Sequence, residues 1–428
     1  MVRYFRLGRH SPFMRYLLLS LFLLVHMAPM ACTAFKVTKD SRTFVGNNED
    51  SWSINAQVRF VQGYNGDYGA IYFDHFNGHP FRQMGPQLGM NEAGLVFDGL
   101  TIQPKHTTPV PGLKEVRFDD LLPLLMRTCA SVHEAATLLR TYDFSWLTRS
   151  MLFFADRNGD YLIVESDTMI LGNDPSYAVG NWRMGTCSDP ATIPIPRLQA
   201  GRQLLLTGSG ASLEEAEEVL STMTVCRPRM GEGTLFSVLF DPTDATAHLY
   251  FYHDFNQRVT FDLKEELAKG DRVIPMASLF TPNTEYGALQ AYVTPFHRRW
   301  LWWGLAGLAG LALVAGFLNL VSVLRGVVAR LRRRSAGPLL PAVLMGIGSA
   351  AVIGLVGVLL LNEGVYYFGL GDLHPLLAWL PLALCLGWGL LVRSAWTEAT
   401  GRRWTRFSTA VVLLPFLALL GYWGMLWP

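Results

Sequence analysis

One cysteine in this chain stands where an apolar N-terminal segment ends and a strand-like segment begins. The run "YLLLSLFLLVHMA" continues into "PMA" and then into Cys32, which opens the alternating segment "CTAFKV". If a leader is removed after Ala31, the thiol and a free α-amine belong to one residue. An α-amine titrates near ~7.7–8.0, so a fraction of it is unprotonated at neutral pH and can take the thiol's proton. The pattern predicts a cysteine nucleophile at a new N-terminus, with no separate histidine required.

A lipid-bearing cysteine is the alternative interpretation of the same residue. A lipoprotein cysteine is typically preceded, three positions earlier, by a branched apolar residue, whereas this chain has Pro29 there. It is also followed by a flexible linker, whereas Cys32 leads directly into a strand. A chain with several membrane spans gains little from an acyl anchor. We therefore favour the nucleophile and keep the lipoprotein as the second hypothesis.

The histidines and the remaining cysteines carry less information. His75 and His79 flank the turn in "DHFNGHP" without a third ligand nearby, so we interpret them as solvated loop residues rather than a metal pair. We find no metal or cofactor motif and predict neither. A net charge of +2, with no basic block interleaved with aromatic residues, argues against a nucleic-acid partner. The cysteines Cys129, Cys187 and Cys226 allow one disulfide without fixing its pairing.

The order of elements after Cys32 predicts an α+β domain. Strands alternate around the turn "KDSR", helices follow, and further hairpins and one more helix complete the segment. Helices segregated from mainly antiparallel strands indicate layers rather than a βαβ winding. The local signals are a helix over 117–128, capping boxes at Ser131–Glu134 and Ser212–Glu215, and hairpin turns at Asn158–Gly159 and Asp241–Asp244.

The two ends of the chain predict export and membrane insertion. Residues 1–31 combine four arginines with an apolar core and are predicted to be a signal peptide, followed by a catalytic domain at 32–280 and a linker at 281–298. Residues 299–428 are predicted to form a membrane domain with four transmembrane helices. These apolar runs are 300–324, 339–361, 376–392 and 408–427.

The arginines predict the orientation of the chain in the membrane. Arginines crowd the loop after the first span and the loop between the third and fourth, so both loops are expected in the cytoplasm. The N-terminal domain is then extracytoplasmic, on the periplasmic or external side, where a cleaved leader would deliver it. The arginines of these two loops are Arg325, Arg330, Arg332, Arg333, Arg334, Arg393, Arg402, Arg403 and Arg406.

Several motifs in chain order resemble the choloylglycine hydrolase and penicillin V acylase family. They are "CTAF", "GNNEDSW", "GMNEAGLVFDGL", "ADRNGDYLIVES", "YAVGNW", the arginine in "IPIPRLQAGRQLL", and "TLFSVLFDPT". The similarity covers roughly residues 32–265. This family of linear-amide hydrolases belongs to the N-terminal-nucleophile superfamily, so the resemblance implies an αββα four-layer sandwich with the cysteine at the end of a central strand.

The resemblance also implies roles for individual residues. Cys32 matches the nucleophile, Asp50 the aspartate that positions it and its α-amine, and Asn181 the amide that faces the tetrahedral oxyanion. Arg197 matches the arginine near the nucleophile that lowers the thiol pKa, with Arg202 as a rival. Two positions depart from the bile-salt hydrolases. Asn47 replaces their arginine, which puts the bile-salt substrate class in doubt, and Thr101 replaces an asparagine, so that its hydroxyl is expected to contribute weakly to the oxyanion site.

These features together predict a membrane-anchored hydrolase that cleaves linear amide bonds of small N-acyl compounds. Because lipid-like acyl chains partition into the bilayer, we expect the substrates to carry such chains. The alternatives are acyl transfer through the same cysteine thioester and a non-catalytic lipoprotein or receptor with a degenerate hydrolase fold. The expected partners are the small-molecule amide and the lipid bilayer. The sequence does not predict the oligomeric state.

Overall fold

The structure is a computed structural model that describes residues 32–76, 86–208, 212–225, 233–332, 339–371, 373–397 and 400–426. The predicted signal peptide therefore lies outside the described residues, as do His79 and Cys226. The chain divides into an N-terminal unit that ends at His297 and a C-terminal unit that begins at Arg298.

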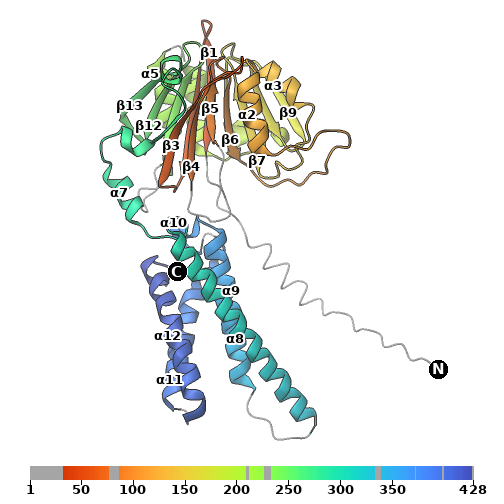
Figure 1. The fold of residues 1–428 in the computed structure, drawn as a ribbon, viewed down its shortest axis with the longest axis vertical. Helices are drawn as coiled ribbons and strands as arrows, with labels where there is room; N and C mark the ends of the chain where they lie inside the picture. Colours follow the sequence, from red (N-terminus) through yellow and green to blue (C-terminus); the bar gives the residue numbers. More distant parts are fainter. Residues whose placement is uncertain are drawn as a thin grey trace, which may run out of the picture. The chain divides into compact units, whose positions relative to one another are not determined.

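The N-terminal unit contains two antiparallel sheets, drawn as arrows in Figure 1. Sheet A has the strand order β10-β1-β2-β11-β12-β13, and sheet B has the order β14-β3-β4-β5-β6-β7-β8-β9. The strands of sheet A are β1 (Thr33–Lys39), β2 (Arg42–Ser51), β10 (Ser176–Gly180), β11 (Gly233–Asp241), β12 (Thr246–Phe251) and β13 (Asp254–Asp262). Those of sheet B are β3 (Asn55–Val61), β4 (Ala70–Phe76), β5 (Leu88–Asn91), β6 (Val96–Thr101), β7 (Ser150–Ala155), β8 (Tyr161–Glu165), β9 (Thr168–Gly172) and β14 (Arg272–Pro275).

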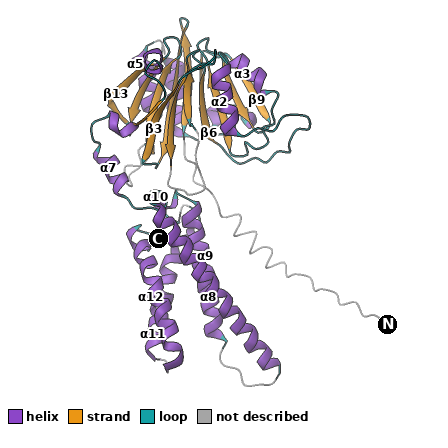
Figure 2. Ribbon diagram, viewed as in Figure 1, coloured by secondary structure: helices purple, strands orange, loops and turns teal. Residues whose placement is uncertain are grey.

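Helices cover the outer face of each sheet. The helices of this unit are α2 (Phe118–Thr128), α3 (Val132–Leu139), α4 (Pro196–Thr207), α5 (Leu213–Thr222), α6 (Leu263–Leu267) and α7 (Thr284–Ala291). Helices α2 and α3 pack on sheet B, and α4 and α5 pack on sheet A. The two sheets thus lie between two helical layers, and the predicted α+β class with antiparallel sheets is confirmed (Figure 2).

Aromatic side chains fill the space between the sheets. Phe73 of β4 contacts Phe236 and Phe240 of β11, with ring centroids 6.3 and 5.8 Å apart. Phe60 of β3 contacts Phe261 of β13 at 5.4 Å. Because both faces of each sheet are covered, central strands such as β11 are buried along their whole length. The edge strands β13 and β14 alternate mainly between partly buried and exposed residues.

The local sequence signals form the elements they predict. The chain reverses at Asp40 and Ser41, both at positive φ, and β1 pairs with β2. The hydroxyls of Ser131 and Ser212 accept from the backbone N–H groups of Glu134 and Glu215 at the starts of α3 and α5. Gly159 adopts φ +84° in the β7–β8 turn, a conformation that glycine accommodates readily.

The segment 281–298, predicted as a linker, contains helix α7 and packs onto the sheets. Tyr286 is buried, contacts the rings of Phe251 and Tyr252, and donates its hydroxyl to the backbone oxygen of Ile54 at 2.8 Å. His297 is also buried, and its ring lies 2.8 Å from the backbone oxygens of both Trp52 and Tyr292. The N-terminal unit therefore continues to His297 instead of ending at residue 280.

The C-terminal unit is helical. Its helices are α8 (Arg299–Leu331), α9 (Leu340–Leu361), α10 (Val365–Phe368), α11 (Leu380–Thr397) and α12 (Thr400–Tyr422). Within this unit α8 packs against α9 and α11 against α12, and Trp388 Nε1 of α11 donates to the backbone oxygen of Ala410 at 2.8 Å. Among the described residues, three helical segments are long and apolar enough to cross a membrane: Arg299–Leu331, Leu340–Leu361 and Pro375–Arg393.

The fourth predicted span is shorter in its apolar part. Helix α12 begins with a basic stretch, and its apolar part, Thr409–Tyr422, falls below the length of the other three. A helix rises ~1.5 Å per residue, so such a segment covers about 21 Å of a hydrocarbon core that is ~30 Å thick. Four transmembrane helices remain a prediction, whereas three apolar helices of spanning length are observed.

Candidate active site

Cys32 lies at the start of a central strand. The residue directly precedes β1, which pairs with β10 on one side and β2 on the other. In this antiparallel register Thr33 lies opposite Gly180 and Asn48. The C-terminal ends of β10 and β2 therefore lie beside Cys32, and they carry Asn181 and the pair Glu49–Asp50. The register explains why residues far apart in the sequence meet at this point.

The Cys32 thiol is buried and faces a carboxylate. Its side chain donates to Glu49 Oε2 at 3.4 Å, and the residue is 5% exposed. Burial raises the pKa of the thiol well above its usual range, and the carboxylates of Glu49, Asp50 and Asp98 raise that pKa further. A hydrogen bond from the Asp50 backbone acts in the opposite direction. At neutral pH the thiol thus holds its proton, and its reaction as a nucleophile requires an acceptor.

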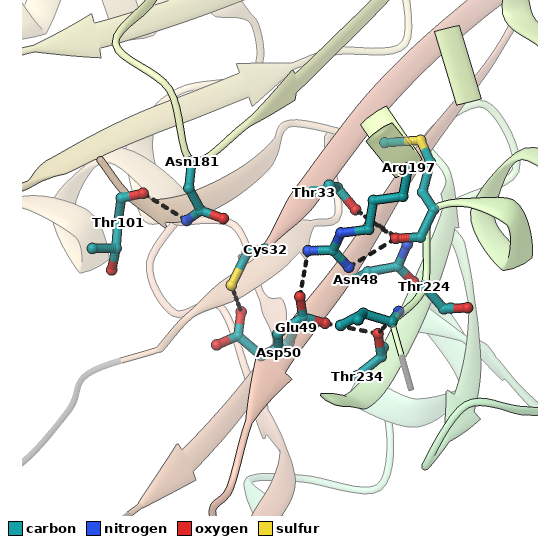
Figure 3. Close-up of polar contacts among 12 residues, drawn as sticks. Cys32, Thr33, Asn48, Glu49, Asp50, Thr101, Asn181, Arg197, Thr224 and Thr234 are labelled. Atoms are coloured by element: carbon teal, nitrogen blue, oxygen red, sulfur yellow. Dashed lines mark hydrogen bonds and ion pairs between the residues drawn. The ribbon is translucent and has the colours of Figure 1, made fainter. Parts of the chain in front are cut away.

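Asp50 is fixed by two side chains from elsewhere in the unit (Figure 3). Thr234 of β11 donates its hydroxyl to Asp50 Oδ1 at 2.7 Å, and Arg197 of α4 donates from Nη2 to Asp50 Oδ2 at 2.5 Å. A second donor of Arg197, Nη1, reaches the backbone oxygen of Met223 at 2.9 Å. Asp50 is 2% exposed, so the ion pair keeps its buried charge compensated.

Of the two arginines considered in the sequence, the structure places Arg197 beside Asp50. The expectation that Arg197 lowers the thiol pKa is not met. Its guanidinium is paired with the Asp50 carboxylate, whereas the thiol itself is surrounded by carboxylates and shielded from water, so its pKa rises. Arg197 therefore orients Asp50.

Asn181 lies on the other side of Cys32 from Glu49 in Figure 3. It is 3% exposed, and Nδ2 donates to the backbone oxygen of Thr101 at 2.6 Å. An amide nitrogen carries two hydrogens, so one remains available to an oxyanion. Among the described residues, no hydrogen-bond partner is found for Asn181 Oδ1. Asn181 is thus a donor that is oriented in advance and still has spare hydrogen-bonding capacity.

The loop that carries Asn181 is held by residues that the sequence analysis did not identify. Gln103 donates to the backbone oxygen of Asn181 at 2.9 Å and accepts from the backbone N–H of Arg183 at 2.9 Å. Arg183 in turn forms a buried ion pair with Glu165 at 3.0 Å. These contacts join the end of β10 to sheet B and fix the position of Asn181.

Thr101 takes part through its backbone and not through its hydroxyl. Its carbonyl accepts the hydrogen bond from Asn181, while its side chain is exposed at the end of β6. Figure 3 shows the hydroxyl pointing away from Asn181 and Cys32. The contribution of this hydroxyl to an oxyanion site stays a prediction, and the observed contact of Thr101 with Asn181 is made by its carbonyl.

Asn47 forms a bridge between the two sheets. Its Nδ2 donates to Asp98 Oδ2 at 2.5 Å, and both residues are buried. Burial and the nearby Glu49 raise the pKa of Asp98 well above its usual range. Asn47 thus supplies a neutral amide that is already paired with a carboxyl group.

His75 differs from its sequence interpretation as a solvated loop residue. It lies in β4, is 2% exposed, and places Nε2 at 2.8 Å from Glu49 Oε1. Its other ring nitrogen, Nδ1, lies 3.2 Å from Ser51 Oγ. The sequence signal for this placement is the strand pattern of "GAIYFDHF", because the histidine lies inside it and Phe76 ends it.

The described residues contain no group of three or more His, Cys, Asp or Glu side chains arranged to hold a metal ion. Cys32, Cys129, Cys187 and Cys385 are free thiols in the part of the chain that the structure describes.

Comparisons with known proteins give similarity to solved structures only. No protein-family model matches the chain. No curated protein matches it either. The structure is similar to a variant of conjugated bile acid hydrolase from Clostridium perfringens, with 15% identity and a TM-score of 0.43 over 59% of this chain and 97% of that chain. A second variant of the same hydrolase gives 15% identity and a TM-score of 0.44 over the same shares. Penicillin V acylase from Agrobacterium tumefaciens gives 14% identity and a TM-score of 0.40 over 51% of this chain and 83% of that chain.

Proposed function

We propose that this chain is a membrane-anchored, extracytoplasmic cysteine hydrolase of the N-terminal-nucleophile type that cleaves linear amide bonds of N-acyl compounds. The observation that carries the proposal is the surroundings of Cys32. A buried thiol at the start of a central strand has carboxylates on one side and the oriented amide of Asn181 on the other.

In the proposed reaction, removal of residues 1–31 makes Cys32 the first residue. The thiolate attacks the amide carbonyl, and a sulfur–carbon bond forms. Asn181 Nδ2 stabilises the resulting oxyanion. The carbon–nitrogen bond then breaks, the leaving amine takes a proton, and water hydrolyses the thioester to release the acid and restore the thiol. Asp50, held by Arg197 and Thr234, orients the end of β2 beside the nucleophile.

The substrate class follows from the setting of the domain. Three apolar helices of spanning length support attachment to a bilayer, which concentrates lipid-like acyl chains. Asn47 stands where bile-salt hydrolases have an arginine, so we propose N-acyl amines or N-acyl amino acids rather than bile salts. The deep burial of Cys32 disfavours the lipoprotein alternative, because an acylated sulfur would need an exit to the membrane.

The experiment compares wild type with Cys32→Ser on a panel of N-acyl amides by mass spectrometry of the products. We expect wild type to release the free acid and Cys32→Ser to lose at least ~10³-fold in turnover, because a serine hydroxyl is a far weaker nucleophile here. Addition of an amine acceptor tests acyl transfer in the same assay. Turnover by Cys32→Ser at the wild-type rate would contradict the proposal.

A further inference from the structure

A continuous line of buried hydrogen bonds runs from the nucleophile into sheet B. The Cys32 thiol contacts Glu49 Oε2 at 3.4 Å, and the other oxygen, Oε1, contacts His75 Nε2 at 2.8 Å. His75 Nδ1 lies 3.2 Å from Ser51 Oγ, which also accepts from the backbone N–H of Ser53 at 3.2 Å. Glu49 and His75 are each 2% exposed. The line crosses from β2 to β4 at the Glu49–His75 contact, which joins the two sheets, and returns to β2 at Ser51.

The directions of these bonds follow from the donors and acceptors present. Glu49 has two carboxylate oxygens and, when ionised, can only accept, so the thiol and His75 Nε2 both donate to it. Because Ser51 Oγ already accepts from the backbone, its own hydrogen is available to His75 Nδ1. The imidazole thus has Nε2–H directed at Glu49, which orients the carboxylate toward the sulfur.

This arrangement differs from the usual order of a nucleophilic triad. In most cysteine and serine hydrolases the histidine contacts the nucleophile and a carboxylate lies behind it. Here the carboxylate contacts the nucleophile and the histidine lies behind the carboxylate. Glu49 is therefore the group in direct position to receive a proton from the sulfur.

The α-amine of a mature Cys32 is less suited to that task. An α-amine titrates near ~7.7–8.0, so most of it is already an ammonium group at pH 7. In that form it can give a proton and cannot take one. The two proton transfers therefore fall to different groups: Glu49 accepts the thiol proton, and the α-ammonium protonates the leaving amine.

We propose that Glu49, oriented by His75, is the general base that accepts the thiol proton of Cys32. The proposal rests on the hydrolase function given above. In acylation the proton passes from sulfur to Glu49, the sulfur–carbon bond forms, and the α-ammonium gives its proton to the departing nitrogen as the carbon–nitrogen bond breaks. In deacylation the α-amine takes a proton from water, hydroxide attacks the thioester, and the departing thiolate recovers its proton from Glu49.

The test uses Glu49→Gln in the full-length protein. The glutamine oxygen can still accept from His75, but the side chain can no longer take a proton. Turnover is measured with an N-acyl p-nitroanilide in detergent, and thiol reactivity is measured as the rate of alkylation of Cys32 by iodoacetamide against pH. Asp74→Asn is the matched control, since Asp74 is an equally buried carboxylate adjacent to His75 in β4 that pairs with Arg59.

The two readouts of Glu49→Gln are expected to move in opposite senses. Among the described residues, the charged groups that act on the thiol are Glu49 and Asp50 from β2 and Asp98 from β6, and the charge of each raises the thiol pKa. Loss of the Glu49 charge therefore moves the alkylation midpoint to lower pH, so that more thiolate is present at neutral pH. Turnover nevertheless falls ~10²–10⁴-fold, the usual contribution of a general base. Asp74→Asn is expected to leave both readouts near wild type.

Other outcomes separate the two proposals. Turnover of Glu49→Gln at or above the wild-type rate overturns the role of Glu49 as a base. An alkylation midpoint unchanged from wild type overturns the same role, and that measurement needs no substrate. If Cys32→Ser retains activity, the hydrolase function fails as well, whereas a failure confined to Glu49→Gln leaves it standing.

His75→Phe, which cannot donate to Glu49, is expected to lower kcat about tenfold with little change in KM, and His75→Gln to restore part of the loss. Melting curves of each variant verify that the fold is retained.

Discussion

At the scale of single residues, the candidate site combines a buried thiol, which we propose as the nucleophile, with groups that are fixed before any substrate binds. Cys32 lies beside Glu49, and Asp50 is held by Thr234 and Arg197. Groups that are held in place in this way need no reorganisation during a reaction. The sequence could indicate the residue types at these positions. It could not indicate that Arg197 would contact Asp50 instead of the thiol, since that depends on how α4 packs against sheet A.

The role of Asn181 leads to a prediction about two neighbouring side chains. Asn181→Ala removes the proposed oxyanion donor, and kcat is expected to fall ~10²–10³-fold with a smaller change in KM. Thr101→Ala is the matched control, because the Thr101 carbonyl that holds Asn181 is retained while the exposed hydroxyl is lost. Steady-state kinetics on one N-acyl amide compare the two. A loss in Thr101→Ala as large as that in Asn181→Ala would assign the oxyanion contact to the hydroxyl.

At the scale of elements, the structure separates what local sequence determines from what it does not. The turn at Asn158–Gly159 and the caps at Ser131 and Ser212 follow from residues next to one another in the chain, so the sequence indicates them. His75 could not be placed in the same way. Its partner Glu49 lies on the other sheet, and a contact between sheets depends on the packing of the whole unit.

The segment 281–298 shows the same limit. It has the short length and the turn residues of a linker, yet Tyr286 and His297 are buried through contacts with Phe251, Tyr252, Ile54 and Trp52. These partners lie about 30 or more residues earlier in the chain, where no local pattern relates them to the segment. In the structure the compact N-terminal unit therefore extends to His297.

A truncation series tests this boundary. A chain that ends at His297 is expected to fold in the absence of the membrane helices, whereas a chain that ends at residue 280 loses the aromatic packing of α7 and exposes Phe251 and Tyr252. The shorter chain should melt at a clearly lower temperature or aggregate. His297→Ala in the longer chain is the milder comparison and should cost about 1–3 kcal/mol, because the backbone oxygens of Trp52 and Tyr292 lose their partner. Equal melting temperatures for the two truncated chains would return 281–297 to the status of a linker.

At the scale of the whole molecule, the chain joins a two-sheet unit with a buried thiol to a helical unit with three apolar helices of spanning length. Helix α8 alone is about 50 Å long, which exceeds the ~30 Å hydrocarbon core of a bilayer. Its apolar part precedes Arg325 and Arg330, and this order is the basis of the predicted orientation with these arginines in the cytoplasm. The proposed function requires that residues 1–31 be removed on the opposite side.

The most direct test of the account is therefore the mass of the mature N-terminal peptide from the full-length protein purified out of its membrane. We predict a first peptide that begins at Cys32 with a free thiol and an unmodified α-amine. A protein that is active on N-acyl amides yet begins at any other residue, or that carries an acyl or glyceride group on Cys32, would contradict it.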